Sequence, residues 1–205
     1  MQIRPAAPQD APQAAPLLVS TMGQFGVALL GEDSLQHTEA VMEKLFSRPG
    51  NRFNWQVTHL AEVEGTAAGL LASFPGKEIS KRELPLLWQI WPANGFLRTL
   101  RLTLRGLPAA FTPREALPDE YHIAHLAVSP EFQRRGIGKA LLKHAEALAS
   151  QAGYRKCSLN VEINNNPAQA LYEKMGYVVK NAHQFPDKIS EKYKIIGFEH
   201  RVKDI

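Results

Sequence analysis

A short basic loop between two regular elements has the residue types that bind an anion. The loop runs from Gln133 to Lys139 and reads QRRGIGK. It follows an apolar, β-compatible run from Tyr121 to Val128, which stops at Ser129-Pro130 because proline cannot continue a central strand. From Ile137 onwards apolar residues recur at helical spacing until Gly153. The sequence therefore predicts a strand, a basic loop and a helix in succession.

This arrangement has a chemical consequence. The first turn of a helix leaves backbone N–H groups unpaired and carries the positive end of the helix dipole, so a phosphate fits there. Gly136 and Gly138 have no side chain, which lets a phosphate approach the backbone closely. Arg134, Arg135 and Lys139 add positive charge around the same loop. We therefore expect the loop to bind a phosphate.

Two common phosphate loops do not fit these residues. A P-loop needs a glycine where Gln133 stands and a serine or threonine where Ala140 stands. A dinucleotide loop needs a third glycine, at the position of Leu141. The pattern that fits is Q/R-x-x-G-x-G/A directly after a strand that ends in Leu126-Ala127-Val128. It resembles the pyrophosphate loop of the GNAT superfamily of acyl-CoA N-acyltransferases.

A second segment carries the same resemblance independently. The residues from Asn165 to Tyr177 are similar to the family's N-x-x-A-x-x-L-Y-x-x-x-G-F/Y segment, and the two motifs stand in the family's order, separated by a strand. The alternative is an ordinary βαβ unit with a surface anion loop. Because both motifs lie in the predicted context, we favour the family.

The resemblance implies an α/β fold, with a mixed, splayed sheet of about seven strands flanked by helices. We expect one N-acetyltransferase domain over residues 1–205, built around the loop. The other expected elements are strands at Met1–Pro5, Trp55–Val63, Thr66–Phe74 and Tyr154–Ile163, helices from the N-cap Asp10 to about Phe25, at Ser34–Phe46 and at Pro167–Met175, and a final strand pair at Tyr177–Lys180 and Tyr193–Val202.

A helical insertion at residues 76–118, between the third and fourth strands, is the main departure from a minimal family member. We expect two short helices broken at Pro92, the first covering Leu86 to Trp91 and the second Phe96 to Leu107. The second would carry arginines on one face and leucines on another, at Arg98, Arg101, Arg105, Leu97, Leu100 and Leu104. A lid over the acceptor site, a dimer contact and a membrane-surface helix are three readings. We favour a lid or a contact in a homodimer, because the apolar face needs protein cover.

The resemblance also implies acetyl-CoA as cosubstrate, with direct transfer of the acetyl group to a primary amine of a small molecule or a protein. The strand backbone at Leu126, Ala127 and Val128 would pair with the pantetheine arm. Asn165 would reach the same arm. The pyrophosphate would lie on the loop residues Gln133, Arg134, Arg135, Gly136, Ile137, Gly138 and Lys139.

Two side chains match catalytic positions of the family. Tyr172 would stabilise the leaving thiolate by a hydrogen bond, since full proton transfer between an ordinary phenol and an ordinary thiol is uphill by roughly 2 kcal/mol. His122 matches the position of a general base on the central strand. Strand alternation places His125 on the opposite face. Asn160 stands where other members have a glutamate. His125, Glu162 or a water remain alternatives for the base.

The bulk properties exclude several classes of protein. The 205 residues carry a formal net charge of +4, and no nucleic-acid motif or metal-ligand spacing occurs, so we expect neither nucleic acid nor a metal. The single cysteine, Cys157, allows no internal disulfide. We expect His144 at the surface of its helix. Without a secretory leader or a membrane span, the sequence predicts a cytoplasmic protein. The alternative function is a non-catalytic coenzyme A-binding module that assembles through residues 76–118.

Overall fold

A seven-stranded sheet forms the centre of the molecule. The computed structural model describes residues 1–30, 34–97, 99–100 and 115–205. The predicted helix from Phe96 to Leu107 lies mostly outside the described residues, including Arg98, Arg101, Leu104 and Arg105, and the side chain of Phe25 is likewise not described. The strands are β1 (Gln2–Pro5), β2 (Thr58–Val63), β3 (Thr66–Pro75), β4 (Tyr121–Val128), β5 (Lys156–Glu162), β6 (Val178–Gln184) and β7 (Gly197–Asp204).

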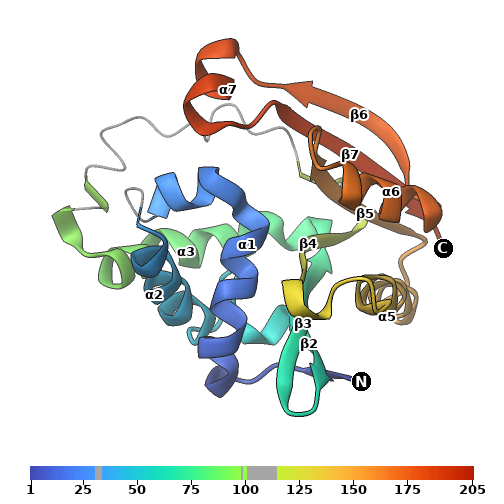
Figure 1. The fold of residues 1–205 in the computed structure, drawn as a ribbon, viewed down its shortest axis with the longest axis horizontal. Helices are drawn as coiled ribbons and strands as arrows, with labels where there is room; N and C mark the ends of the chain where they lie inside the picture. The colour runs from blue at the N-terminus through green and yellow to red at the C-terminus, as the bar shows by residue number, and fades with distance from the viewer. Residues whose placement is uncertain (31–33, 98, 101–114) are drawn as a thin grey trace.

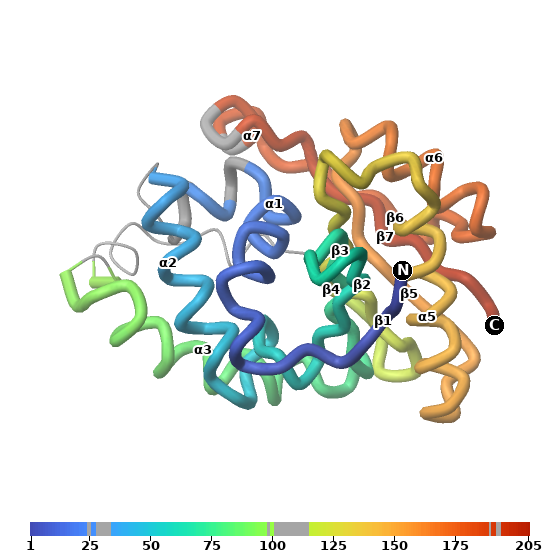
Figure 2. Tube along the Cα trace, turned by 60° about the horizontal axis from the view of Figure 1, so that its bottom comes forward, coloured from blue at the N-terminus to red at the C-terminus, as the bar shows by residue number. Residues whose placement is uncertain are grey.

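The strand order is β1-β2-β3-β4-β5-β7-β6, and only the β4–β5 pair is parallel. Helices α1 (Ala11–Leu30), α2 (Leu35–Phe46) and α3 (Ile79–Asn94) gather on one side of this sheet, while α5 (Ile137–Gln151) lies on the other (Figures 1 and 2). Helix α6 (Asn166–Lys174) packs with α5, and α7 (Asp187–Tyr193) connects β6 to β7. The short 3₁₀ turns cover Pro8–Asp10, Trp55–Val57, Gly76–Glu78 and Pro130–Phe132.

The hydrophobic core has two parts, one on each face of the sheet. On one face Leu18 of α1 and Phe46 of α2 pack against Leu60 and Leu70 of the sheet. On the other face, residues of α5 and α6 pack against β3, β4 and β5, with Leu142 among the fully buried side chains. Burying a large aliphatic side chain contributes about 1.5–3 kcal/mol, so both helix layers are fixed to the sheet.

The sheet opens between β4 and β5. These strands pair over only three positions, Tyr121 to Cys157, His122 to Ser158 and Ile123 to Leu159, while β4 continues to Val128 with β3 as its sole partner in the described sheet. On its β5 side, β4 therefore has no partner strand from Ala124 onwards in the described sheet, and there the backbone carbonyl of Val128 accepts from Nε2 of Gln133 at 3.4 Å. This opening confirms the prediction of a splayed, mixed sheet.

A register shift in β4 corrects the prediction for the two histidines. Ala72 of β3 faces His125 but the next residue, Ser73, faces Ile123, so Ala124 is an extra residue, as in a β-bulge. Simple alternation had placed His122 and His125 on opposite faces. The extra residue reverses the alternation, and both side chains lie on the α1 side of the sheet. His125 contacts Thr21 and Phe53, and His122 contacts Glu115, which Arg52 binds.

Other boundaries also differ from the sequence expectation. Helix α1 begins after a 3₁₀ turn, and Asp10 accepts a hydrogen bond from the backbone N–H of Ala7 at 2.8 Å instead of capping α1. α1 continues past Phe25 to Leu30, with a break at Gly23. The first three residues of the predicted strand from Trp55 form a 3₁₀ turn. Helix α7 replaces what the sequence predicted as a polar loop and the start of a strand.

The insertion contains one long helix in the described residues. α3 passes through Pro85 and Pro92 and ends at Gly95, whose φ of +88° favours glycine. The predicted break is therefore at Gly95 and not at Pro92, and Phe96, Leu97, Thr99 and Leu100 beyond it are helical, as predicted. The helix continues through Pro92 although a proline removes one hydrogen bond and crowds the preceding turn.

Candidate active site

The basic loop has the geometry of an anion-binding site. Gly136 is the N-cap residue of α5 with φ +80°, and no side chain caps the first turn of this helix. A Cβ at this position would have no heavy atom within 4 Å. The space beside Gly136 is therefore open, and the same loop carries the exposed side chains of Arg134, Arg135 and Lys139.

The second glycine of the loop has a packing role. A Cβ on Gly138 would lie 3.1 Å from Cδ2 of Leu171 and 3.8 Å from Cγ2 of Val128. Gly138 therefore brings α5 close to α6 and to the end of β4. This contact joins the loop to the end of β4 and to α6, the helix that carries Tyr172.

Tyr172 belongs to α6, the helix that Leu171 brings close to Gly138. Its side chain is buried, and its ring centroid lies 6.2 Å from that of Tyr177. Burial raises the pKa of Tyr172 to about 12, although the nearby Arg201 opposes the shift. A phenol with this pKa acts as a hydrogen-bond donor to a thiolate and not as a full proton donor. Asn165 caps α6 by accepting the N–H of Ala168 at 3.2 Å.

His122 belongs to a buried network that the sequence did not predict. Its Nε2 lies 3.6 Å from Oε2 of Glu115, and its Nδ1 lies 3.4 Å from Oγ of Ser158. The guanidinium of Arg52 donates two hydrogen bonds to the Glu115 carboxylate, at 2.8 and 2.6 Å. Burial alone would raise the pKa of Glu115, but the charge of Arg52 and the contact with His122 outweigh it and hold the pKa well below its ordinary value.

Glu115 belongs to the end of the insertion and lies next to residues that the structure does not describe. No motif marks it, because its partner Arg52 is 63 positions away in the chain and neither residue lies in a regular element. Only the fold brings the two charges together beside His122. The last residues of the insertion therefore contribute a side chain to the network around a candidate base.

His125 is held in one tautomer. Thr21 donates its hydroxyl hydrogen to the carbonyl of Leu18, so its oxygen accepts from Nδ1–H of His125 at 2.7 Å. Nε2 then carries the lone pair, and it is buried without a hydrogen-bond partner in the described part of the chain. Burial lowers the pKa of His125 to about 3. An imidazole with this pKa is a weak acceptor for an ammonium proton.

Glu162 lies at the open end of β5. It stands three positions beyond Leu159, where the pairing with β4 ends. One carboxyl oxygen lies 3.3 Å from the place that a Cβ on Gly23 of α1 would take. Burial raises the pKa of Glu162 above its ordinary value. Glu162 is therefore a desolvated carboxylate between the break in α1 and the opening of the sheet.

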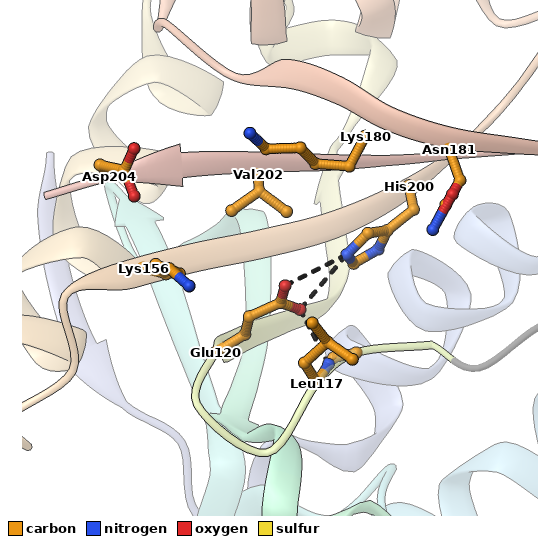
Figure 3. Close-up of a pocket in the computed structure, with 9 residues that line it drawn as sticks. Leu117, Glu120, Lys156, Lys180, Asn181, His200, Val202 and Asp204 are labelled. Atoms are coloured by element: carbon orange, nitrogen blue, oxygen red, sulfur yellow. Dashed lines mark hydrogen bonds and ion pairs between the residues drawn. The ribbon is translucent and has the colours of Figure 1, made fainter.

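A separate pocket of about 320 Å³ lies at the opposite end of β5 (Figure 3). Figure 3 shows Glu120 and His200 facing each other in it, with Lys156, Lys180 and Asp204 around them. A hydrogen-bonded chain leads from this pocket towards the site. Nε2 of His200 lies 3.3 Å from Glu120, Nδ1 of His200 lies 3.0 Å from Asn160, and Asn160 donates to the backbone carbonyl of Glu115 at 3.0 Å.

Two further predictions concern residues away from the opening. His144 is partly buried and not at the surface, since its ring packs edge-on against His59 with centroids 4.6 Å apart. Cys157 is buried, as predicted, and burial raises its pKa to about 12, which makes the thiol unreactive.

No group of three or more metal-ligating side chains occurs among the residues that the structure describes. No helix among them is long and apolar enough to cross a membrane.

Comparison with known families identifies the fold and the activity together. A model described as the acetyltransferase (GNAT) family matches residues 31–177, which include the basic loop, the unpaired edge of β4 and Tyr172. The chain belongs to the GNAT acetyltransferase family. As a member, this GNAT protein is an acetyl-CoA-dependent N-acetyltransferase, and the predicted activity is confirmed. A non-catalytic coenzyme A-binding module is not favoured.

Curated relatives of this GNAT protein act on a protein amine. Over 114 residues it is 33% identical to the [ribosomal protein bS18]-alanine N-acetyltransferase of Salmonella typhimurium, a match that covers 48% of this chain and 77% of the relative. The Escherichia coli K12 enzyme of the same name is 38% identical over 77 residues, which cover 38% of this chain and only 52% of the relative. The chain therefore spans about half the length of this second enzyme.

Solved structures share the fold over the whole chain. An N-acetyltransferase from Staphylococcus aureus Mu50 aligns with a TM-score of 0.75 and 24% identity, and covers 99% of this chain and 100% of its own. The PaiA N-acetyltransferase from Thermoplasma acidophilum, solved in complex with coenzyme A, aligns with a TM-score of 0.55 and 14% identity over 100% and 98% of the two chains. These similarities support the splayed α/β architecture.

Proposed function

We propose that this GNAT protein acetylates the α-amine at the N-terminus of a protein, with the cofactor held between the basic loop and the open edge of β4. The single observation that supports the cofactor position is that two binding features lie on the same strand–loop–helix unit. Gly136, the N-cap residue of α5, borders open space, and β4 has no partner strand on its β5 side from Ala124 to Val128. An extended arm with a pyrophosphate end matches both.

The backbone residues would divide the binding between them. Leu126, Ala127 and Val128 would pair with the pantetheine amides as a missing strand does, and one N–H of this segment would polarise the thioester carbonyl. Gln133 to Lys139 would hold the pyrophosphate through backbone N–H groups, with three basic side chains nearby. Asn165, at the start of α6, would contact the arm. Acetyl-CoA supplies an activated thioester, so the chain need only position it and handle protons.

Side chains would supply the catalytic groups, one for the leaving thiolate and one for the amine. Tyr172 would donate a hydrogen bond to the departing thiolate, where negative charge develops. His122 remains one of two candidates for the base. Both of its ring nitrogens are directed at protein groups, so it could reach the amine only through Ser158 or a water. The other candidate is Glu162, which needs no relay.

The acceptor is supported by the named relatives alone. The two bS18-alanine enzymes acetylate a protein N-terminus, according to their names. A relative from Corynebacterium glutamicum, mycothiol acetyltransferase, is 34% identical over 71 residues and indicates a small-molecule amine as the second possibility. Residues 76–118 would act as a lid over the acceptor site or as a contact in a homodimer, in a cytoplasmic protein.

The direct test is calorimetric titration with acetyl-CoA and with coenzyme A, followed by a transfer assay. Binding in the micromolar range is expected for both, because the proposed contacts hold the part that they share. Thiol release would then be measured with a peptide that begins with free alanine and with the same peptide blocked at its N-terminus. Release with both peptides would indicate a lysine acceptor. Release with neither, despite binding, would exclude the protein N-terminus.

A further inference from the structure

The carboxylate of Glu162 lies on the α1 side of the sheet, at the end of β5 where it has separated from β4. Its neighbour on the same face, Asn160, points to His200 and to the backbone of Glu115. Glu162 approaches α1 instead, where its Oε1 lies 3.3 Å from the place of a Cβ on Gly23. The carboxylate is thus beside the opening and not inside the buried network.

The charge of Glu162 has no counterpart in the described part of the chain. Its side chain makes no hydrogen bond or ion pair with any described residue, although its backbone carbonyl accepts from Asn165 and Gln169. Two other carboxylates on this part of the molecule differ, since Glu115 is bound by Arg52 and Glu120, at the opposite end of β5, lies against His200. A half-buried, uncompensated carboxylate favours the arrival of a cation. An acceptor amine arrives as an ammonium cation at neutral pH.

The space in front of Glu162 depends on a break in α1. Gly23 has φ +57° and ψ −159°, a conformation that residues with a side chain avoid, in the middle of an otherwise helical segment. A Cβ at this position would lie 3.3 Å from Oε1 of Glu162, closer than an ordinary contact, so glycine keeps the space beside the carboxylate free. One residue therefore both turns the helix and keeps the approach to the carboxylate free.

We propose that Glu162 binds the ammonium group of the acceptor and removes its proton, and that the break in α1 at Gly23 admits this group. The proposal rests on the proposed function. One N–H proton passes to the carboxylate, which leaves a neutral amine with a lone pair. The C–N bond then forms as the C–S bond breaks, and the second nitrogen proton goes to the thiolate. Glu162 finally returns its proton to solvent.

The test compares Glu162→Gln with the wild-type enzyme, using the alanine peptide as acceptor. The amide keeps the shape but loses the charge and the basicity, so kcat/KM for the peptide should fall about 100-fold. The Kd for coenzyme A should stay within about two-fold, since Glu162 does not face the loop. The remaining activity should rise with pH from 6 to 8, because only the fraction of peptide that is already neutral can react.

Two controls separate the proposed role from general damage. Glu64→Gln changes an exposed carboxylate in the β2–β3 turn and should leave kcat/KM unchanged. Gly23→Ala should raise KM for the peptide, because it strains the backbone and places a methyl group against the carboxylate. Gly153→Ala also imposes strain, at φ +80°, in a place with no atom within 4 Å of the new Cβ, and should not affect KM.

The outcomes distinguish this inference from the proposed function. An active wild-type enzyme whose Glu162→Gln variant is equally active overturns the role of Glu162 alone. A loss confined to His122→Gln, with Glu162→Gln unaffected, assigns the base to His122 and also overturns it. If the wild-type enzyme binds coenzyme A but does not acetylate the free peptide, the proposed function fails and the inference fails with it. A loss in Glu162→Gln with intact coenzyme A binding supports both.

Discussion

The cofactor side and the acceptor side of the sheet are assembled in different ways. On the cofactor side, the strand, loop and helix from Tyr121 to Gln151 follow one another in the chain, and the proposed anion site consists of the backbone of consecutive residues. On the acceptor side, Gly23, Arg52, Glu115, His122 and Glu162 come from five separate segments. The family's chemistry is thus local in the chain on one side and dispersed on the other.

This difference determines how each side can vary. A backbone site depends on a few glycines and a helix start, so it leaves a readable motif and tolerates little change. A site made of dispersed side chains leaves no motif, and it can change whenever an insertion such as residues 76–118 adds a residue like Glu115. Substitutions on the two sides should therefore affect cofactor and acceptor separately, which the following variants test.

The largest expected effect is on cofactor binding. Gly136→Glu should weaken acetyl-CoA binding about 1,000-fold, because it strains a residue at φ +80° and puts a negative charge before the helix start. Loss of two charge-assisted hydrogen bonds is worth about 4 kcal/mol. Calorimetry measures the Kd. The matched control is Gly65→Glu, which imposes the same φ of +80° in a distant turn, and an equal loss there would refute the loop assignment.

The next effect is on turnover alone. Tyr172→Phe should lower kcat about 100-fold while the Kd of coenzyme A stays the same, since the hydroxyl acts only when the thiolate forms. Tyr177→Phe removes another buried phenol, whose ring lies 6.2 Å away, and should leave kcat unchanged. Steady-state kinetics of thiol release measure both. Equal rates for wild-type and Tyr172→Phe enzymes would show that the phenol only packs α6.

A third variant acts on the stability of the acceptor side. Glu115→Ala should lower the free energy of unfolding by about 3 kcal/mol, because it leaves the guanidinium of Arg52 buried without its partner. Glu83→Ala should lower the free energy of unfolding by less than about 1 kcal/mol, because the Glu83 side chain is 49% exposed and 3.5 Å from the same guanidinium. Urea unfolding measures both, and similar losses in the two variants would contradict the assignment.

The same carboxylate predicts a pH dependence. The folded-state pKa of Glu115 is lowered, so its contribution to stability is fully present above the unfolded value of about 4.5 and is lost as the pH falls below it. The unfolding free energy of the wild-type protein should therefore decrease more steeply below pH 4.5 than that of Glu115→Ala. Parallel curves for the two proteins would show that Arg52 does not hold this carboxylate.

The smallest effect on the cofactor side should come from the insertion. Leu84, Leu87 and Trp88 lie on one exposed face of α3, and Trp88 is 79% exposed. Trp88→Ser should change the Kd of acetyl-CoA by less than about two-fold, because α3 lies on the far side of the sheet from the loop (Figure 1). Sedimentation would show whether the variant alters self-association. A large loss of acetyl-CoA affinity would mean that the two sides are not separate.

The sequence by itself determined the elements that local rules govern. Proline at position 130, the glycines of the loop and the helical spacing after Ile137 predict β4, the loop and α5, and the matched motifs predict the family and the splayed sheet. These features depend on the conformational preferences of neighbouring residues, which can be predicted for each segment separately. The same rules failed at Pro92, where the helix continues, and in the segment that forms α7.

Only the tertiary structure decided which side chains meet on the acceptor side. The extra residue at Ala124 brought His122 and His125 to one face, a change that alternation cannot show because it depends on pairing with β3. The Arg52–Glu115 pair and the approach of α1 to Glu162 join residues that are far apart in the chain. Such contacts arise from packing of the whole core, so no local pattern encodes them.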